Sequence, residues 1–247
     1  METIINVENL CKSYGDIRAV QNVNISVCRG EVFGLLGANG AGKSTTIECI
    51  LGTRKHDSGN VSVLGLNPHI EKNRKALFEK VGVQFQEANY QDKITVWELC
   101  EVTSSLYKTP ASYQALLKQF SIEDKMKSPV NELSGGQKQR LFIVLALLPN
   151  PEVVFLDELT TGLDPRARRD VWKCLSELKS KGLTILLTSH FMDEVEILCN
   201  KIIILKKGNI IFQGTVNEAI ENSPHEKFED AYLWYTDESE VAENESI

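Results

Sequence analysis

The residues with the clearest chemistry lie at positions 37–44, which read Gly-Ala-Asn-Gly-Ala-Gly-Lys-Ser. Three glycines allow the backbone to turn tightly and to point successive N–H groups into one concavity. An apolar run at 32–36 precedes them and a helical pattern at 45–51 follows, so the positive end of a helix dipole adds to the field. This order predicts a phosphate-binding loop rather than a glycine-rich turn with an incidental lysine.

In such a loop Lys43 would reach the β- and γ-phosphates of a nucleotide, and the Ser44 hydroxyl would ligate Mg²⁺. The residues expected to contact the nucleotide are Gly37, Asn39, Gly40, Ala41, Gly42, Lys43, Ser44 and Thr45.

An acidic pair, Asp157 and Glu158, directly follows the continuous apolar run at 153–156. Such a run is typical of a central strand of a parallel sheet, and ligands of these sheets bind at the carboxyl edge. Beside a phosphate loop, Asp157 would hold Mg²⁺ and Glu158 would orient or deprotonate an attacking water. The alternative interpretation is a surface pair at the end of a strand.

Two single residues have weaker signals of their own. His190 follows an expected strand at 183–188, which puts it at the same sheet edge as Lys43 and Asp157, although a lone histidine is more often a surface or core residue. Tyr14 lies in an expected turn at 13–16, where it could stack on an adenine ring or pack on its own hairpin.

The segment 133–137, Leu-Ser-Gly-Gly-Gln, precedes a long helical pattern that ends near 148. Ser134 and Gln137 have capping-box spacing, so the segment could simply begin the helix. Two glycines in a first turn cost about 1 kcal/mol each relative to alanine. That cost is expected where the backbone approaches a ligand closely, and the exposed start of a helix is an anion site.

The elements around these residues alternate between strand and helix, which predicts an α/β fold with a P-loop NTPase core and a mostly parallel sheet. Residues 3–10 and 17–27 alternate apolar and polar side chains and predict an N-terminal antiparallel β subdomain. Residues 87–132, with a capping box at Thr95 and Glu98, predict an inserted all-helical subdomain. We therefore expect one domain at 1–236 and an acidic, disordered tail at 237–247.

Composition narrows the function classes. The net charge of −7 is carried by residues 226–247, so residues 1–225 balance at zero and no nucleic-acid partner is expected. The longest apolar stretch, 141–148, is far shorter than the ~20 residues of a membrane span. The six cysteines form no C-x-x-C pair and are read as reduced, which together with the absence of a targeting pattern predicts a cytoplasmic protein.

In order and spacing, these motifs resemble those of the nucleotide-binding subunit of ATP-binding cassette (ABC) transporters, over residues 3–220. The resemblance is carried by Tyr14, residues 37–44, Gln86, residues 133–137, 155–158 and 162–164, and His190. Leu-Ser-Gly-Gly-Gln is the signature of the family and is more specific than the phosphate loop.

The resemblance implies a role for each matching residue. Tyr14 would stack on the adenine of ATP, and Lys43 with the loop amides would hold the phosphates. Mg²⁺ would be bound by Ser44, Gln86 and Asp157; Glu158 would be the general base, and His190 would hold the γ-phosphate and the attacking water. The segment Ser134, Gly135, Gly136 and Gln137 would contact the γ-phosphate bound to a partner subunit, with Asp164 across the same interface.

The family's active unit is two cassettes, head to tail around two ATP, so the resemblance implies a dimer, here expected to be a homodimer. The helical block 87–132, hinged at Gln86, would dock an integral membrane permease and hold the protein on the cytoplasmic face of the membrane. Residues 161–165, 189–196 and 228–233 resemble exporters of the ABC-2 type, which export drugs, antibiotics and peptides. An importer ATPase, or a soluble ABC ATPase acting on ribosomes or DNA, remains an alternative.

One position departs from the family pattern. Leu159 stands where the family usually has proline after the acidic pair. Leucine keeps both carboxylates but removes a rigid φ constraint, so we expect hydrolysis to be reduced but not absent.

Overall fold

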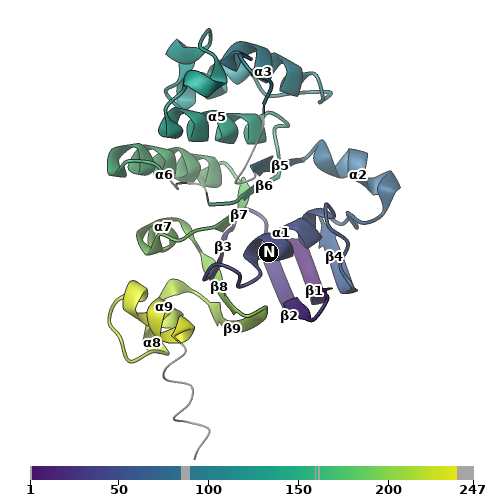
Figure 1. Ribbon diagram of the computed structural model, residues 1–247, viewed down its shortest axis with the longest axis vertical. Coiled ribbons are helices and arrows are strands. Elements are labelled where there is room, and N and C mark those ends of the chain that lie inside the picture. Colours follow the sequence, from purple (N-terminus) through teal and green to yellow (C-terminus); the bar gives the residue numbers. More distant parts are fainter. Residues whose placement is uncertain (1, 85–89, 159, 161, 238–247) are drawn as a thin grey trace, which may run out of the picture. The chain divides into compact units, whose positions relative to one another are not determined.

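The computed structural model describes residues 2–84, 90–158, 160 and 162–237. Its residues group into two compact units, whose elements are labelled in Figure 1. The first unit comprises Met1–His69 and Thr188–Ile247, and the second comprises Ile70–Leu187. Gln86, Leu159 and the expected tail beyond Asp237 lie outside the described residues.

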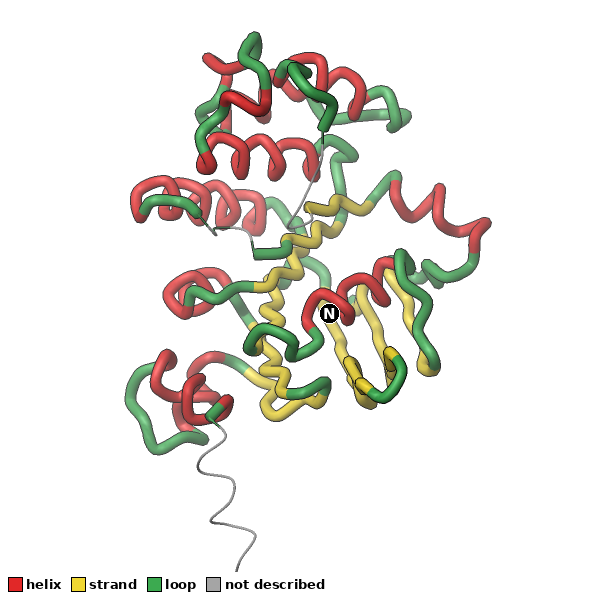
Figure 2. Tube along the Cα trace, in the orientation of Figure 1, coloured by secondary structure: helices red, strands yellow, loops and turns green. Residues whose placement is uncertain are grey.

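The first unit contains a three-stranded antiparallel sheet; Figure 2 draws all strands in yellow. It has the order β2-β1-β4 and consists of β1 (Thr3–Tyr14), β2 (Ile17–Cys28) and β4 (Ser58–Val63). In β2, Val23, Ile25 and Val27 are buried while the residues between them are exposed, which is the alternation expected of a half-buried strand. The turn expected at 13–16 is shorter than predicted. Strand β1 continues through Tyr14, and only residues 15–16 form the turn.

Parallel strands form the centre of the first unit. Strand β3 (Val32–Gly37), buried along its whole length, pairs in parallel with β8 (Lys201–Lys206), and β9 (Asn209–Gly214) adds antiparallel to β8. The helices are α1 (Lys43–Leu51), α7 (Met192–Leu198), α8 (Val216–Glu221) and α9 (Phe228–Thr236). A core of fully buried side chains, including Leu36, Ile204 and Phe228, joins α7, α8 and α9 to these strands.

The second unit has its own parallel strands, β5 (Val81–Gln84), β6 (Val153–Leu156) and β7 (Thr184–Thr188). The last residue of β7, Thr188, is assigned to the first unit. All four residues of β6 are buried, as its continuous apolar sequence predicts. The α-helices are α2 (Glu71–Phe78), α3 (Val96–Ser104), α4 (Tyr113–Gln119), α5 (Gly135–Leu147) and α6 (Pro165–Ser180). Two short 3₁₀ helices, η1 (Glu123–Lys125) and η2 (Val130–Glu132), lie between α4 and α5.

The expected α/β class, with an antiparallel β subdomain and mostly parallel central strands, is confirmed. Side-chain caps fix the starts of the helices near the predicted motifs. Thr95 and Glu98 form the predicted capping box of α3, and Ser134 and Gln137 form that of α5. Asp164 caps α6 by accepting hydrogen bonds from Arg166 N and Ala167 N, both at 2.9 Å.

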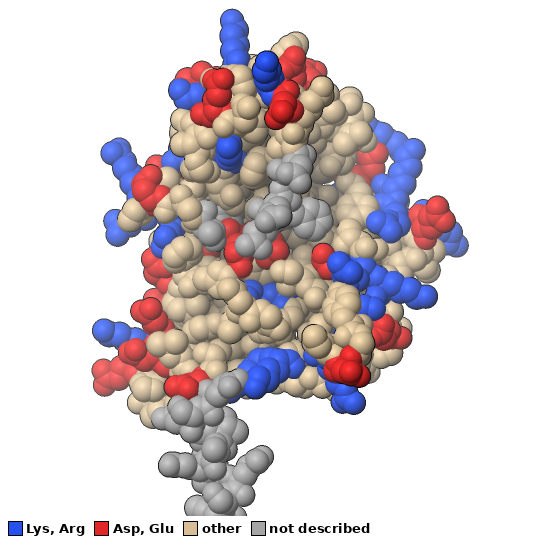
Figure 3. Space-filling model, viewed as in Figure 1, with Lys and Arg blue, Asp and Glu red and all other residues tan. Residues whose placement is uncertain are grey.

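Lysine and arginine side chains alternate with acidic ones over the face drawn in Figure 3, in keeping with the balanced charge of residues 1–225. All six cysteines are free in the structure. Among the described residues, none of the helices has the length and hydropathy that crossing a membrane requires.

Candidate functional site

The predicted phosphate loop joins β3 to α1 in the first unit. Its lysine is already held in place: Lys43 is 6% exposed, and its Nζ donates hydrogen bonds to Gly37 O at 2.7 Å and to Ala38 O at 3.2 Å. The tip of the loop, Ala38 to Gly40, is exposed. The loop thus combines an inward-held ammonium group with an open rim, an arrangement suited to an anion.

Gly42 shows why this loop needs glycine. It caps α1 with φ 105°, a region that side chains rarely adopt, and a Cβ there would lie 2.2 Å from Ala19 O and 3.7 Å from the Cα of Gly208. Gly208 in turn donates from its N–H to Ala41 O at 3.0 Å. The base of the loop is therefore clamped between β2 and the β8–β9 turn.

Two hydroxyl groups at the start of α1 have different positions. The Thr46 side chain is buried and donates to Gly42 O at 2.8 Å, so it fixes the loop to the helix. Ser44 is exposed at the helix N-terminus. A serine hydroxyl at this position of a phosphate loop is a known type of Mg²⁺ ligand, so the donor chemistry of Ser44 fits this ion.

Tyr14 lies at the end of β1 and is 41% exposed. Lys12 Nζ and Arg54 Cζ each lie 5.4 Å from the centre of its ring, within the range of a cation–π interaction. Lys12 is paired with Asp57 at 2.9 Å, and this hydrogen bond raises the pKa of Lys12. The ring is thus held among charged groups with part of its surface accessible. Its two cationic neighbours were not predictable from the sequence pattern.

His190 is exposed in the segment between β7 and α7. Ser189, directly before it, is 2% exposed, and its Oγ donates to the carboxylate of Glu194 and accepts from Phe191 N at 3.0 Å. Sequence reasoning missed Glu194, which is fully buried. A signal was present, because Glu194 falls on the same helical face as the buried Val195 and Leu198.

The acidic pair lies at the carboxyl end of β6 in the second unit. Asp157 is 8% exposed, and its N–H donates to Gln84 O at 3.1 Å, which joins the ends of β6 and β5. Glu158 is partly exposed and has a backbone φ of 52°. A positive φ in a residue other than glycine is strained, and such strain is found preferentially at functional sites.

The second unit also brings the segment 133–137 next to the segment 162–164. A Cβ on Gly136 would lie 3.3 Å from Leu163 Cδ2, and one on Gly135 would lie 3.8 Å from Gly162 O. Ser134 accepts from Gln137 N at 3.3 Å, so the capping interpretation holds. Ser134 and Gly135 are nevertheless exposed, which leaves the helix start accessible. The hydrogen bonds from the backbone N–H groups of Ala167 and Arg166 lower the pKa of Asp164.

Comparison with known proteins gives the family. The family model described as "ABC transporter" matches residues 20–161. A relative from Ralstonia nicotianae, called Nod factor export ATP-binding protein I, is 39% identical over 224 residues, which cover 88% of this chain and 68% of the relative. The protein of the same name from Burkholderia orbicola is 40% identical over 223 residues, with 88% and 73% covered.

Solved structures agree with this match. A structure described as the ATP-binding subunit of an ABC transporter has a TM-score of 0.84 and 27% identity and covers 95% of this chain and 100% of its own. A dimeric ATP-binding cassette in a post-hydrolysis state, bound to ADP and phosphate, has a TM-score of 0.78 and 27% identity, with 86% and 98% covered. The chain belongs to the ABC transporter family. It is an ATP-binding and ATP-hydrolysing cassette with the P-loop NTPase fold.

Proposed function

We propose that this cassette powers export through a separate membrane permease, working as a head-to-tail dimer on the cytoplasmic face of the membrane. We further propose one cassette at 1–236 with a helical block inserted at 87–132, because the elements described from Val96 to Glu132 are all helices. Export is supported by relatives that carry it in their name, at about 40% identity over most of the chain.

In the first unit, the proposed roles concern ATP binding. Tyr14 stacks on the adenine, and the loop amides from Gly37 to Thr45 hold the phosphates together with Lys43. The buried position of Lys43 supports this, because its ammonium group is oriented before the nucleotide arrives and loses little freedom on binding.

Hydrolysis needs a metal ion, a base and a group that holds the γ-phosphate. Ser44 and Asp157, with the predicted assistance of Gln86, would hold Mg²⁺, which would supply positive charge to neutralise the phosphates when bound. Glu158 accepts a proton from the attacking water, and His190 hydrogen-bonds the γ-phosphate and that water. The partly exposed carboxylate of Glu158, at the carboxyl end of a parallel strand, supports this assignment.

The observation that carries the dimer is the accessible start of α5. Ser134 and Gly135 are exposed, and Gly136 lies against the loop that leads to Asp164. An exposed helix start with two glycines is a second phosphate-binding feature, distinct in sequence from the phosphate loop. We infer that it binds the γ-phosphate held by the partner cassette.

The substitution Glu158→Gln tests this mechanism. It removes the base but keeps the shape of the side chain, so we expect kcat to fall by about 10²- to 10⁴-fold and an ATP-bound dimer to accumulate. Size-exclusion chromatography with light scattering, in saturating ATP and Mg²⁺, measures the dimer. A variant that remains monomeric under these conditions would argue against the two-cassette mechanism. The matched control is Glu152→Gln, on the surface before β6.

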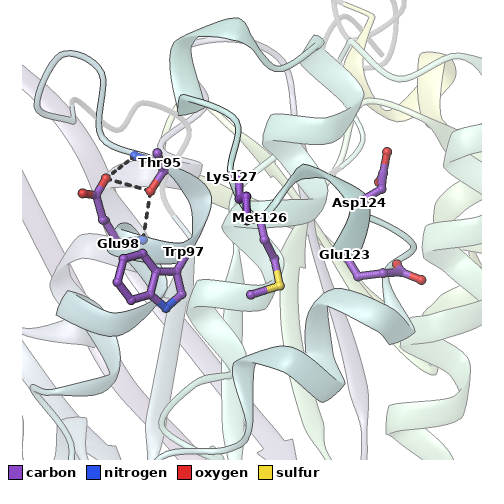
Figure 4. A pocket seen from close by; sticks show the side chains of 7 residues that line it. All are labelled: Thr95, Trp97, Glu98, Glu123, Asp124, Met126 and Lys127. Carbon is purple, nitrogen blue, oxygen red and sulfur yellow. Dashed lines mark hydrogen bonds between the residues drawn. The ribbon is translucent and has the colours of Figure 1, made fainter.

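The permease needs a docking surface, and the second unit contains a suitable groove. A cavity of about 620 Å³ is lined by Thr95, Trp97, Glu98, Glu123, Asp124, Met126 and Lys127. In Figure 4, Trp97 lies beside the capping box of α3, and Met126 lies between this group and the carboxylates of Glu123 and Asp124. Trp97 is 48% exposed. We propose that a permease segment with an apolar anchor and a basic flank binds here, since three of the four charged lining residues are acidic.

Co-purification from native membranes in mild detergent tests the docking. The wild type should recover a multi-span protein in stoichiometric amount, and Trp97→Ala with Glu123→Lys should lose it while the ATPase rate of the isolated cassette is unchanged. Glu132→Lys, an exposed acidic residue outside the groove, is the matched control. Recovery of the wild type with ribosomes or DNA would favour the alternative of an ABC ATPase outside membranes. A binding protein in the recovered complex would favour an importer.

A further inference from the structure

A buried carboxylate near His190 has no role in the mechanism above. Glu194, in the first turn of α7, is 0% exposed and lies on the face that also buries Val195 and Leu198. Removing a carboxylate from water costs several kcal/mol unless hydrogen bonds compensate, so glutamate is rarely fully buried without polar partners. An apolar side chain would fill this position at lower cost.

The hydrogen bonds of Glu194 lead to the segment that carries His190. The Ser189 hydroxyl donates to Glu194 Oε2, and its own oxygen, Ser189 Oγ, accepts a hydrogen bond from the N–H of Phe191 at 3.0 Å. Ser189 is 2% exposed, so water does not compete freely for these bonds. The Ser189 hydroxyl thus links Ser189 to Phe191, and His190 lies between these two residues in the chain.

This arrangement fixes the orientation of one hydroxyl group. A serine Oγ–H has a single proton, and the carboxylate directs that proton toward α7. A lone pair is then available for Phe191 N, which closes a small turn around His190. Without the carboxylate the hydroxyl could rotate to donate to Phe191 O, which lies 3.4 Å away.

We propose that Glu194 is a positioning residue for His190, acting through Ser189. Glu194 fixes the turn 189–191 relative to α7, so that the exposed imidazole is presented in one orientation for the γ-phosphate. The inference rests on the role of His190 in the proposed function. Binding of ATP, which depends on Tyr14 and the phosphate loop, does not require it.

Two substitutions of similar volume separate the hydrogen bond from the bulk of the side chain. Glu194→Gln retains an oxygen that accepts from Ser189, whereas Glu194→Met fills the space without an acceptor. We expect Glu194→Met to lower kcat for ATP hydrolysis about 10- to 100-fold, because a small misplacement of a reacting group has this effect. The KM for ATP should stay within about twofold, and Glu194→Gln should retain most of the rate.

Ser189→Ala removes the hydroxyl partner of the same hydrogen bond. Because this substitution deletes only one atom, the variant should fold even if Glu194→Met does not. Its kcat should fall to a similar extent, and Ser189→Ala combined with Glu194→Met should be no slower than the slower single variant. Glu196→Gln, exposed on the same helix, is the control and should match the wild type. Thermal unfolding of each variant is measured alongside.

His190→Ala distinguishes the two possible failures. If it leaves kcat unchanged, the proposed role of His190 is wrong and the positioning proposal fails with it. If His190→Ala is slow but Ser189→Ala and Glu194→Met hydrolyse ATP at the wild-type rate, only the positioning proposal is wrong. A third outcome would also overturn the positioning proposal. If Glu194→Met and Glu194→Gln both lower kcat, raise the KM for ATP and lower the unfolding temperature, the role of Glu194 is purely structural.

Discussion

The backbone of Glu158 differs from that of an ordinary residue at the end of a strand. Its φ of 52° lies in the left-handed region, which costs a residue with a Cβ roughly 1–2 kcal/mol. A residue before proline prefers an extended backbone, with φ of about −120°. Leucine at position 159 therefore permits a conformation of Glu158 that proline, usual in the family, would disfavour.

Substitution of Leu159 by proline should shift Glu158 toward an extended backbone and raise the ATPase rate. We expect an increase of roughly severalfold, because the carboxylate is the proposed base and its placement determines proton transfer. Steady-state phosphate release measures it. The control Leu159→Ala adds no φ constraint and should hydrolyse ATP at the wild-type rate. An unchanged rate in Leu159→Pro would show that the departure from the family pattern has no kinetic effect.

Two buried thiols predict how stability depends on alkaline pH. Burial raises the pKa of Cys49 from 9.0 to about 11 and that of Cys100 to about 12. Between pH 9.0 and these pKa values, the two thiols keep their protons in the folded chain and lose them in the unfolded chain. The free energy of unfolding should therefore decrease as the pH rises from 9 toward 12. Urea titrations of the wild type and Cys100→Ala should show a weaker decrease in the variant, and equal slopes would contradict the assignment.

Among the secondary-structure elements, α5 packs against β5 with unusual closeness. A Cβ on Gly82 would lie 1.9 Å from Ala146 O, so only glycine lets the helix backbone lie directly on the strand. The same helix begins at Gly135, where a Cβ would meet no atom nearer than 3.8 Å. One glycine therefore serves packing, and the other leaves the helix start accessible.

These two glycines predict opposite effects of alanine. Gly82→Ala should destabilise the second unit by about 1–3 kcal/mol or more, as overpacked cores do. Gly135→Ala should leave stability unchanged or slightly improved, since alanine favours helix, but should weaken ATP-dependent dimerisation. Chemical denaturation and light scattering measure the two effects. A stable Gly82→Ala variant would mean that α5 can move away from β5.

The local signals in the sequence predicted most elements well. The capping residues Thr95 and Ser134 precede their helices, and the apolar run at 153–156 is a buried strand. Contacts between distant segments were not predictable in the same way. The pairing of β4 with β1 and the approach of Ala19 to Gly42 depend on how distant strands are placed, which periodicity does not encode. Glu194 was missed because its charge concealed a buried position.

For the whole molecule, the residues beyond Asp237 provide a test of what the cassette requires. Asp237, the last residue of the described part, accepts a hydrogen bond from Lys206 Nζ at 2.9 Å and donates one from its N–H to Leu233 O at 2.7 Å. Deletion of residues 238–247 removes four glutamates and changes the net charge from −7 to −3. We expect unchanged ATPase activity, because every residue with a proposed role in ATP binding or hydrolysis lies between positions 14 and 194. A large loss would show that these residues act on the site, and a variant with the four glutamates changed to glutamine would separate charge from length.

The first unit is assembled from both ends of the chain, which matters during protein synthesis. The motif 37–44 is made early, but β3 pairs with β8, and the loop is clamped by Gly208, about 165 residues later. Nascent chains fold as their contacts become available. A ribosome-bound chain that ends before β8 therefore contains every residue of the motif and lacks the clamp that shapes it. Nucleotide capture should therefore begin only after β8 and the turn at Gly208 have been synthesised and have left the ribosome.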